Sequence, residues 1–328
     1  MHILVIGGAG YIGSHVVKEL LINNIQTTVF DDLSSGQKIN LFPKANFIQG
    51  SVLDKEKLKE AMSTGVDGVI LLAGKKSVGE SMDNPEKYAQ TNLIGAINVL
   101  NTMLECNVKN IVFSSSAATY GNPKYLPIDE NHPQNPMSFY GFTKYNIELL
   151  LDWYSKLKGI KFISLRYFNA VGYDADGDVL GLERNPQNLL PILMEVVCKK
   201  REQLRIFGHD YDTPDGTCIR DYIHVSDLAS AHLKSLIYLN EKQKSEFINL
   251  GTEKGISVME MLQSFEEILG RKIPSCLDSR RAGDPSKIVA SAKKAKELLD
   301  WQPVHSDLKN ILSTTWNVYK KHLEDGTI

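Results

Sequence analysis

The pattern of apolar and polar positions in the first half of the chain alternates between short and long segments. Short apolar runs rich in β-branched residues occur at residues 3–6, 27–31, 46–49, 68–73, 110–114 and 161–166. Longer amphipathic segments of helical length lie between them, at residues 12–23, 54–62, 85–107 and 138–157. This alternation is typical of βαβ units, whose parallel strands form a sheet that helices cover on both faces. The pattern therefore predicts an α/β fold with a Rossmann-type, doubly wound parallel sheet.

The second half of the chain follows a different pattern. After about residue 169 come loops rich in Gly, Asp and Pro, a helix predicted at residues 189–201, and shorter strands. We interpret residues 1–168 as a cofactor-binding domain and residues 169–328 mainly as a smaller α+β substrate-binding lobe over the sheet's carboxyl edge. Residues 221–239 again have the pattern of a strand and a helix, and we expect them to rejoin the first domain.

Composition and charge narrow the class of protein. The 328 residues are 42% hydrophobic and 23% charged, as in ordinary globular proteins. A net charge of −2 argues against a globally basic nucleic-acid binder. The four cysteines lie far apart without a CxxC pair, which favours a reducing compartment over disulfides or zinc. With neither a signal-peptide pattern nor an apolar run of membrane-spanning length, we expect a cytoplasmic protein that binds no membrane.

A glycine-rich segment follows the first predicted strand directly. Gly7, Gly10 and Gly13 have GxxGxxG spacing where that strand meets a helix, and the helix N-terminus offers free N–H groups to a pyrophosphate. Asp31 and Asp32 end the second strand about 20 residues later, where a carboxylate binds ribose hydroxyls and repels a 2′-phosphate. The segment therefore predicts a dinucleotide site that prefers NAD to NADP; the alternative is a merely tight turn with solvated aspartates.

A second set of residues carries candidate chemistry. Tyr140 and Lys144 are four residues apart and share one face of a predicted helix. A phenol has an ordinary pKa near 10, and a nearby ammonium and a cationic nicotinamide would both lower it. Ser114-Ser115-Ser116 closes the fifth predicted strand at the edge where such sheets bind ligands, so a serine hydroxyl there can share a proton with the tyrosine. Taken alone, the Tyr–Lys pair could also be an ordinary surface pair.

These motifs, in this order and spacing, resemble those of the extended short-chain dehydrogenase/reductase superfamily. Further segments are similar to the UDP-glucose 4-epimerase family, and the likeness covers nearly the whole chain. They are GGAGYIGS at residues 7–14, Ala73-Gly74 with Lys76 and VGES at residues 78–81, SSSAATYG at residues 114–121, RYFN at residues 166–169, NLLP at residues 188–191, RDYIHV at residues 220–225, and Arg280-Arg281 with Gly283-Asp284.

The resemblance implies an isomerase of nucleotide-sugar metabolism that interconverts UDP-galactose and UDP-glucose. Tyr140 would take the proton of the sugar's 4-hydroxyl while a hydride leaves C4 for the nicotinamide of NAD. The 4-keto sugar would turn over and receive the hydride on its other face. Lys144 would hold the nicotinamide ribose and lower the pKa of Tyr140, and Ser116 would relay or stabilise the proton.

The resemblance also implies two sets of binding residues. The cofactor set is Gly7, Gly10, Tyr11, Ile12, Gly13, Asp31, Asp32, Ser51, Val52, Leu72, Ala73, Gly74, Lys76, Asn92, Ser114, Tyr140, Lys144 and Tyr167. The UDP-sugar set is Lys76, Ser116, Tyr140, Asn169, Asn188, Leu189, Phe207, Arg220, Arg281 and Asp284, in which the arginines would pair with the diphosphate.

Several positions separate this chain from its sister families or leave its substrate open. Ala117 and Ala118 stand where nucleotide-sugar dehydratases and decarboxylases carry acids, which lowers the case for those reactions. The family's Gly-Asp after the third strand is Gly50-Ser51 here, with Asp54 nearby. Ile288, intermediate in size where relatives select their sugar, leaves an epimerase of UDP-N-acetylhexosamines as an alternative. A non-catalytic NAD-sensing regulator is a further alternative.

Two other features concern metals and partners. Residues 174–178 begin like a calcium loop, but Val179 and Asn185 stand where the required glycine and glutamate should be, so we expect no metal. The resemblance implies a homodimer, in which residues 85–107 and 138–157 would pair with the partner's copies as a four-helix bundle.

Overall fold

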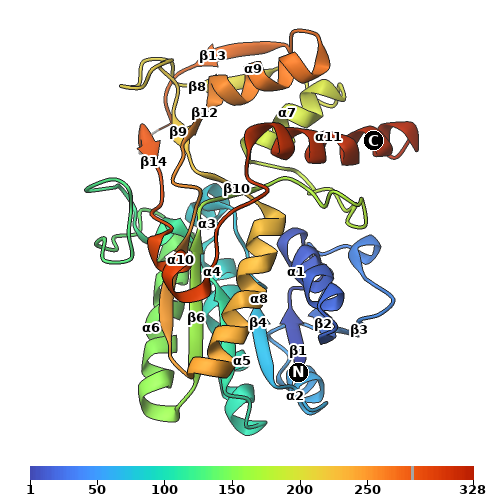
Figure 1. Cartoon of the computed structure of the whole chain (residues 1–328), viewed down its shortest axis with the longest axis vertical. Coiled ribbons are helices and arrows are strands. Elements are labelled where there is room, and N and C mark those ends of the chain that lie inside the picture. Colours follow the sequence, from blue (N-terminus) through green and yellow to red (C-terminus); the bar gives the residue numbers. More distant parts are fainter. Residues whose placement is uncertain (282–283) are drawn as a thin grey trace.

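The structure, a computed structural model, describes residues 1–281 and 284–328. Its centre is a seven-stranded parallel sheet in the order β11-β6-β5-β4-β1-β2-β3 (Figure 1). The strands are β1 (His2–Ile6), β2 (Gln26–Asp31), β3 (Asn46–Gln49), β4 (Gly68–Leu71), β5 (Asn110–Ser114), β6 (Lys161–Tyr167) and β11 (Glu246–Leu250). The predicted Rossmann-type sheet is confirmed, with each of the six predicted strands within two residues of its predicted ends. The seventh strand, β11, was not predicted.

Helices cover both faces of this sheet, each over its own apolar core. One face carries α1 (Tyr11–Ile22), α8 (Val225–Lys242) and α10 (Lys293–Leu299), and α8 packs against α1. The other carries α2 (Lys55–Met62), α5 (Gly95–Glu105) and α6 (Phe139–Lys158). The helix predicted at residues 85–107 is a series of three pieces: α4 (Pro85–Tyr88), the π-helical η2 (Ala89–Ile94), and α5. Shorter elements are η1 (Lys38–Asn40), α3 (Val78–Asp83) and η3 (Ala117–Thr119).

The smaller lobe lies beyond the carboxyl ends of the central strands, at the top of Figure 1. It has its own core, beneath α7 (Leu189–Val197), α9 (Val258–Leu269) and α11 (Leu308–Glu324). Its strands are β7 (Asn169–Val171), β8 (Leu204–Phe207), β9 (Ile219–Arg220), β10 (Tyr222–His224), β12 (Ile256–Ser257), β13 (Ser275–Asp278) and β14 (Lys287–Ile288). The helix predicted at residues 189–201 ends at Val197, because Lys199 adopts a left-handed backbone with φ of 61° that α-helix cannot continue through.

A buried lysine ties the smaller lobe to α1. The ammonium of Lys18 lies 2.5, 2.8 and 2.9 Å from carboxylate oxygens of Asp174, Asp176 and Asp178. These are the residues whose spacing resembles a calcium loop, so the cation that they surround is a side chain of this chain. We call this group the Lys18 clamp.

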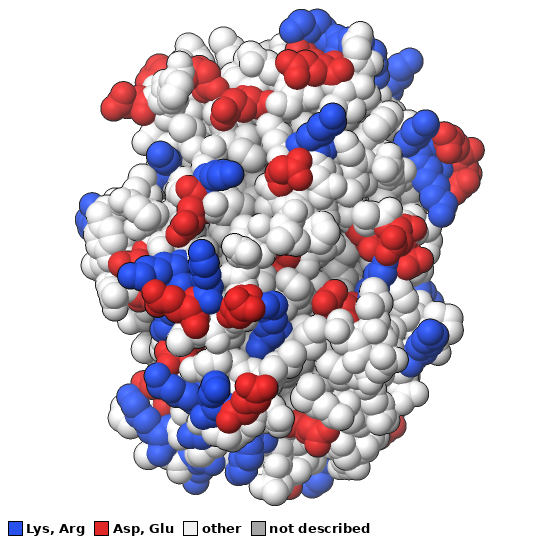
Figure 2. Space-filling view, viewed as in Figure 1, with Lys and Arg blue, Asp and Glu red and all other residues white. Residues whose placement is uncertain are grey.

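The surface carries charges of both signs. On the face drawn in Figure 2, the basic and acidic side chains of the described residues are interspersed, as the net charge of −2 suggests. None of the helices in the described part of the chain is long and apolar enough to cross a bilayer.

Three histidines are buried in a neutral state, and this predicts a pH dependence of stability. Burial lowers the pKa of His15 and His232 to about 4 and that of His224 to about 3. Unfolded histidine titrates near pH 6.5, so below that pH the unfolded chain binds more protons than the folded one. We expect the free energy of unfolding to fall as the pH drops from 6.5 to 4, by up to roughly 4 kcal/mol per pH unit.

Urea unfolding at a series of pH values measures this slope. His232→Gln should reduce the slope of the unfolding free energy against pH by the contribution of one proton, about 1.4 kcal/mol per pH unit. The control His209→Gln replaces an exposed histidine and should leave the slope unchanged. A free energy of unfolding that stays constant from pH 7 to 5 would contradict the prediction.

Candidate functional site

The glycine-rich turn lies where the strand order reverses, between β1 and β4. Gly7 has a φ of 90°, and a Cβ there would lie 2.6 Å from the backbone nitrogen of Ala73. A Cβ on Gly13 would lie 2.1 Å from the carbonyl oxygen of Gly7, so only glycine lets α1 start this close to the turn. The helix begins after Gly10 without a side-chain cap, which leaves its first N–H groups available to a phosphate.

Asp31 fastens this turn at the end of β2. Its two carboxylate oxygens accept hydrogen bonds from the N–H groups of Ala9, at 3.0 Å, and Leu33, at 2.8 Å. Burial raises the pKa of this carboxyl group, although the two N–H groups oppose the effect. Each oxygen keeps a lone pair for a further donor, such as a ribose hydroxyl. Asp32 is exposed and accepts from the N–H of Ser34.

The turn that follows β3 has Ser51 where the family's pattern has an aspartate. The Ser51 hydroxyl accepts from the N–H of Leu53 at 3.3 Å, and Val52 is buried beside it. Asp54 caps α2 by accepting from the N–H of Lys57 at 3.1 Å. The acid nearest to the unusual Ser51 is thus already used as a helix cap.

The segment after β4, which contains Leu72, Ala73 and Gly74, is held by Asn92. The Asn92 amide accepts from the N–H of Lys75 at 2.8 Å and donates to the Lys75 carbonyl at 3.1 Å. It also donates to the Thr143 hydroxyl of α6 at 3.1 Å, a contact that the sequence did not predict. The Lys76 ammonium extends toward the smaller lobe, 2.9 Å from a carboxylate oxygen of Glu183.

Tyr140 and Lys144 lie on α6 beside the carboxyl end of β5. Ser138 caps the helix, and the Tyr140 N–H donates to the Ser81 hydroxyl of α3 at 3.0 Å. The Lys144 ammonium donates to the Ser114 carbonyl at 2.7 Å and lies 5.9 Å from the centre of the Tyr140 ring. The Ser116 hydroxyl accepts from the N–H of Ala118 at 3.1 Å. The structure thus brings the predicted tyrosine, lysine and serine segment together.

Burial affects the two titratable groups in opposite ways. It lowers the pKa of Lys144 to about 8, against the opposing charge of Glu148. It raises the pKa of Tyr140, and the Ser116 hydroxyl only partly offsets this. The phenol is therefore neutral near pH 7 in the protein alone, and it needs added positive charge to act as a base. A cationic nicotinamide ring would supply such a charge.

The predicted diphosphate residues form a chain of contacts in the smaller lobe. Arg220, at the end of β9, forms an ion pair with Asp284, and its guanidinium also donates to the Ile219 carbonyl at 2.8 Å. The Arg281 guanidinium lies 4.0 Å from the centre of the Phe207 ring, and the Asp284 N–H donates to the Arg281 carbonyl. The neighbouring Gly283 lies outside the described residues.

The other predicted residues are more dispersed. Asn188 is exposed just before α7, which Leu189 begins, and Asn169 begins β7. Tyr167 ends β6, with its ring centre 6.3 Å from that of His232. At the start of α1, the Tyr11 hydroxyl donates to the Gly172 carbonyl, and Ile12 follows it.

Comparison with known proteins identifies the family. The sequence matches the NAD dependent epimerase/dehydratase family over residues 3–251. A curated UDP-glucose 4-epimerase of Lacticaseibacillus casei is 42% identical over 326 residues, which cover 99% of this chain and 98% of that protein. The chain belongs to the UDP-glucose 4-epimerase family.

Solved structures of this family agree in fold. UDP-glucose 4-epimerase from Brucella ovis, crystallised with NAD, is 40% identical with a TM-score of 0.95 and covers 97% of this chain and 98% of its own. The UDP-Glc/GlcNAc 4-epimerase of Campylobacter jejuni is 38% identical with a TM-score of 0.86. The match covers 98% of this chain and 99% of that one. The family that the motifs predicted is confirmed, and the predicted cofactor is the one named in the family's description.

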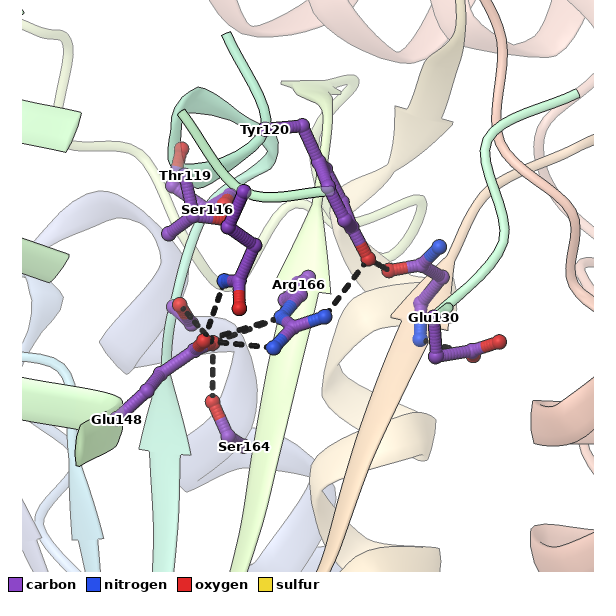
Figure 3. Close-up of polar contacts among 10 residues, drawn as sticks. Ser116, Thr119, Tyr120, Glu130, Glu148, Ser164 and Arg166 are labelled. Carbon is purple, nitrogen blue, oxygen red and sulfur yellow. Dashed lines mark hydrogen bonds and ion pairs between the residues drawn. The ribbon is translucent and has the colours of Figure 1, made fainter. Parts of the chain in front are cut away.

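The sequence did not predict a buried polar network around Glu148, one helical turn after Lys144 on α6 (Figure 3). Its centre is the Glu148 carboxylate, to which Arg166 donates through Nη2 at 2.7 Å and Nε at 2.9 Å. Ser115, Ser164 and Gln134 donate to the same carboxylate. A signal was present, because Tyr140, Lys144 and Glu148 follow one another at four-residue spacing on one helix face.

Proposed function

We propose that this protein interconverts UDP-galactose and UDP-glucose by reversible, NAD-dependent oxidation at C4 through a 4-keto sugar. The observation that carries the proposal is that Tyr140, Lys144 and Ser116 lie at the carboxyl end of β5, on the same edge of the sheet as the glycine-rich turn after β1. It is supported by family membership, since the relatives named above are UDP-glucose 4-epimerases over nearly their full length.

The residues around the glycine-rich turn fit a dinucleotide, because Gly7, Gly8 and Gly10 carry no side chain and the start of α1 is uncapped. We assign the full cofactor set of the resemblance to this role, with the turn at the pyrophosphate, Asp31 at the ribose of adenosine and Lys144 at the ribose of nicotinamide. When bound, NAD would supply the hydride acceptor and hydride donor for C4 of the sugar.

The protein's own groups handle the proton and the substrate. Once its pKa is lowered by positive charge, Tyr140 takes the proton of the 4-hydroxyl, and the Ser116 hydroxyl shares that proton. Arg220 and Arg281 would pair with the diphosphate, and Asp284 already orients Arg220. The remaining members of the UDP-sugar set, Lys76, Asn169, Asn188, Leu189 and Phe207, would line the rest of the site.

The test of this function is incubation with UDP-galactose as the only substrate. We expect UDP-glucose to form with no net NADH, because each cycle regenerates NAD. The heat-denatured protein serves as the control. If the NAD-loaded protein leaves UDP-galactose unchanged, the proposed function is wrong.

Activity on N-acetylated sugars is a second candidate function. It is favoured by the likeness to the Campylobacter jejuni protein, whose description includes UDP-GlcNAc, and by Ile288, which pairs with Arg220 in the small sheet of the sugar lobe. The ratio of kcat/KM for UDP-galactose to that for UDP-N-acetylgalactosamine distinguishes the two. Against a non-catalytic NAD sensor stands the complete Ser116, Tyr140 and Lys144 set.

The proposal extends to organisation and location. Residues 1–168 with residues 221–239 would bind NAD, since α8 packs on α1, and residues 169–328 would mainly bind the UDP-sugar. The adjoining β11 also pairs with β6 in the same sheet. A cytoplasmic location is supported by the four free cysteines.

A homodimer through α5 and α6 is supported by an exposed apolar stripe on α6. Phe142, Leu149, Trp153 and Leu157 are 43%, 43%, 58% and 68% exposed, which is unusual for a row of large apolar side chains on one helix.

We expect Leu157→Lys to weaken this dimer at least tenfold, because it places a charge within the apolar interface. Sedimentation velocity over a range of concentrations measures the effect. The matched control is Ile22→Lys, since Ile22 is 62% exposed on α1, outside the proposed interface. A Leu157→Lys protein with unchanged mass in solution would contradict the proposed interface.

A further inference from the structure

Lys144 and Glu148, one helical turn apart on α6, each contact one of the two residues where β5 ends and the next loop begins. Lys144 donates to the Ser114 carbonyl at 2.7 Å, and the Ser115 hydroxyl donates to the Glu148 carboxylate, also at 2.7 Å. The next residue is Ser116, whose hydroxyl lowers the pKa of Tyr140, the residue one turn before Lys144 on α6. The Ser116 hydroxyl is therefore placed by contacts to its two predecessors as well as by its own.

The Glu148 carboxylate is itself fixed from several directions. It is 1% exposed and accepts hydrogen bonds from Ser115 and Ser164, from Gln134 and from one edge of the Arg166 guanidinium, through Nε and Nη2 (Figure 3). These donors come from the end of β5, from β6 and from the loop before α6. Both carboxylate oxygens thus have at least two partners, which leaves the group little rotational freedom.

Arg166 extends this restraint to the edge of the sheet. Its Nη1 donates to the Tyr120 hydroxyl at 2.9 Å, and that hydroxyl donates to the Asn249 side chain of β11 at 2.6 Å. The Asn249 N–H donates in turn to Glu130 at 2.7 Å. Hydrogen bonds therefore connect Glu148, directly or through Arg166 and Tyr120, to residues of β6 and β11 and to the residue that follows β5.

We propose that Glu148 is a positioning residue for the reaction, which through Ser115 sets the Ser116 hydroxyl against Tyr140. The inference rests on the proposed function, in which Ser116 shares the proton of Tyr140. The reason for its effect is geometric, since a proton is shared efficiently only at hydrogen-bonding distance, and a displacement of about 1 Å can lower a rate by as much as a hundredfold.

The chain offers a matched pair of variants to test this. Ser115→Ala and Ser164→Ala each remove one hydroxyl that donates to the same Glu148 oxygen, at 2.7 and 2.9 Å, from side chains that are 2% and 0% exposed. Only Ser115 adjoins Ser116. We expect Ser115→Ala to lower kcat for UDP-galactose at least tenfold with KM within twofold, and Ser164→Ala to keep kcat within about twofold.

Their similar loss of stability, measured as the change in Tm, checks that the two variants are equally disruptive. Equal kcat values for the two variants, whether both normal or both reduced, would overturn the proposal. If both kcat values were reduced equally, the network around Glu148 would affect turnover only through the stability of the protein.

The pH profile gives a readout that a purely structural role would not move. The Ser116 hydroxyl lowers the pKa of Tyr140, so its displacement should shift the acidic limb of the kcat profile to higher pH in Ser115→Ala only. Lys144 and Tyr167, the other titratable groups that face Tyr140, are unchanged in both variants.

Failure of the proposed function can be told apart from failure of this inference. If the wild-type protein leaves UDP-galactose unchanged, the ultraviolet titration of Tyr140 in the NAD-loaded protein still tests the positioning, with Tyr140→Phe subtracted as reference. The midpoint should rise in Ser115→Ala relative to Ser164→Ala. Identical midpoints would overturn the inference.

Discussion

Replacing Tyr140 with Phe is expected to lower kcat for UDP-galactose by about a hundredfold to ten-thousandfold while NAD stays bound. The change removes only the hydroxyl that accepts and returns the proton. The contact of the Tyr140 N–H with Ser81 and the position of the ring beside Lys144 do not depend on that hydroxyl. Initial rates of UDP-glucose formation and the NAD released on denaturation measure the two parts of the prediction.

Tyr145→Phe is the matched control, because Tyr145 lies on the same helix five residues further on, where it does not share the face of Lys144. That variant should keep kcat within about twofold. Near-normal turnover by Tyr140→Phe would remove Tyr140 from its assigned role.

Arg166→Met is expected to lower the free energy of unfolding by about 3–5 kcal/mol. The variant leaves the Glu148 carboxylate, which is 1% exposed, without its counter-ion and with only neutral donors. Urea unfolding of the NAD-loaded protein measures the loss. The double variant Arg166→Met/Glu148→Leu should recover most of it, because neither charge of this ion pair then remains buried.

Lys156→Met serves as the comparison for an exposed ion pair. Lys156 and Asp152 lie 2.6 Å apart on the surface of α6, with side chains that are 60% and 38% exposed. Its removal should cost less than about 1 kcal/mol, since solvent screens such pairs. An Arg166→Met protein as stable as the Lys156→Met protein would show that the buried pair does not need its counter-ion.

The sequence predicted the elements whose signal is local. The six strands of the first half and the start of α1 were found because apolar runs and glycine spacing identify them without reference to the rest of the chain. The strand β11 was missed because Glu246–Leu250 is a short segment whose place in the sheet depends on pairing with β6, more than 80 residues earlier. The end of α7 was misplaced because the left-handed Lys199 has no clear sequence signal.

The same distinction applies to the site. Tyr140 and Lys144 could be predicted as a pair because one helix carries both at a fixed spacing. The partner of Glu148 could not, since Arg166 reaches it from β6 only when the sheet and α6 are packed together. Residues 174–178 resemble a cation loop because their carboxylates do surround a cation, but that cation belongs to Lys18, which precedes them by more than 150 residues.

The Lys18 clamp also bears on which part of the complex can move during the proposed reaction. It joins α1, whose first turn faces the cofactor site, to the loop that leads into the smaller lobe. Swinging the lobes apart would separate the buried Lys18 ammonium from three carboxylates, one of which, that of Asp174, is itself buried. We therefore expect the two lobes to keep their relative position from one half-reaction to the next. In the proposed reaction, the turn of the 4-keto sugar would then be a movement of the substrate and not of the lobes.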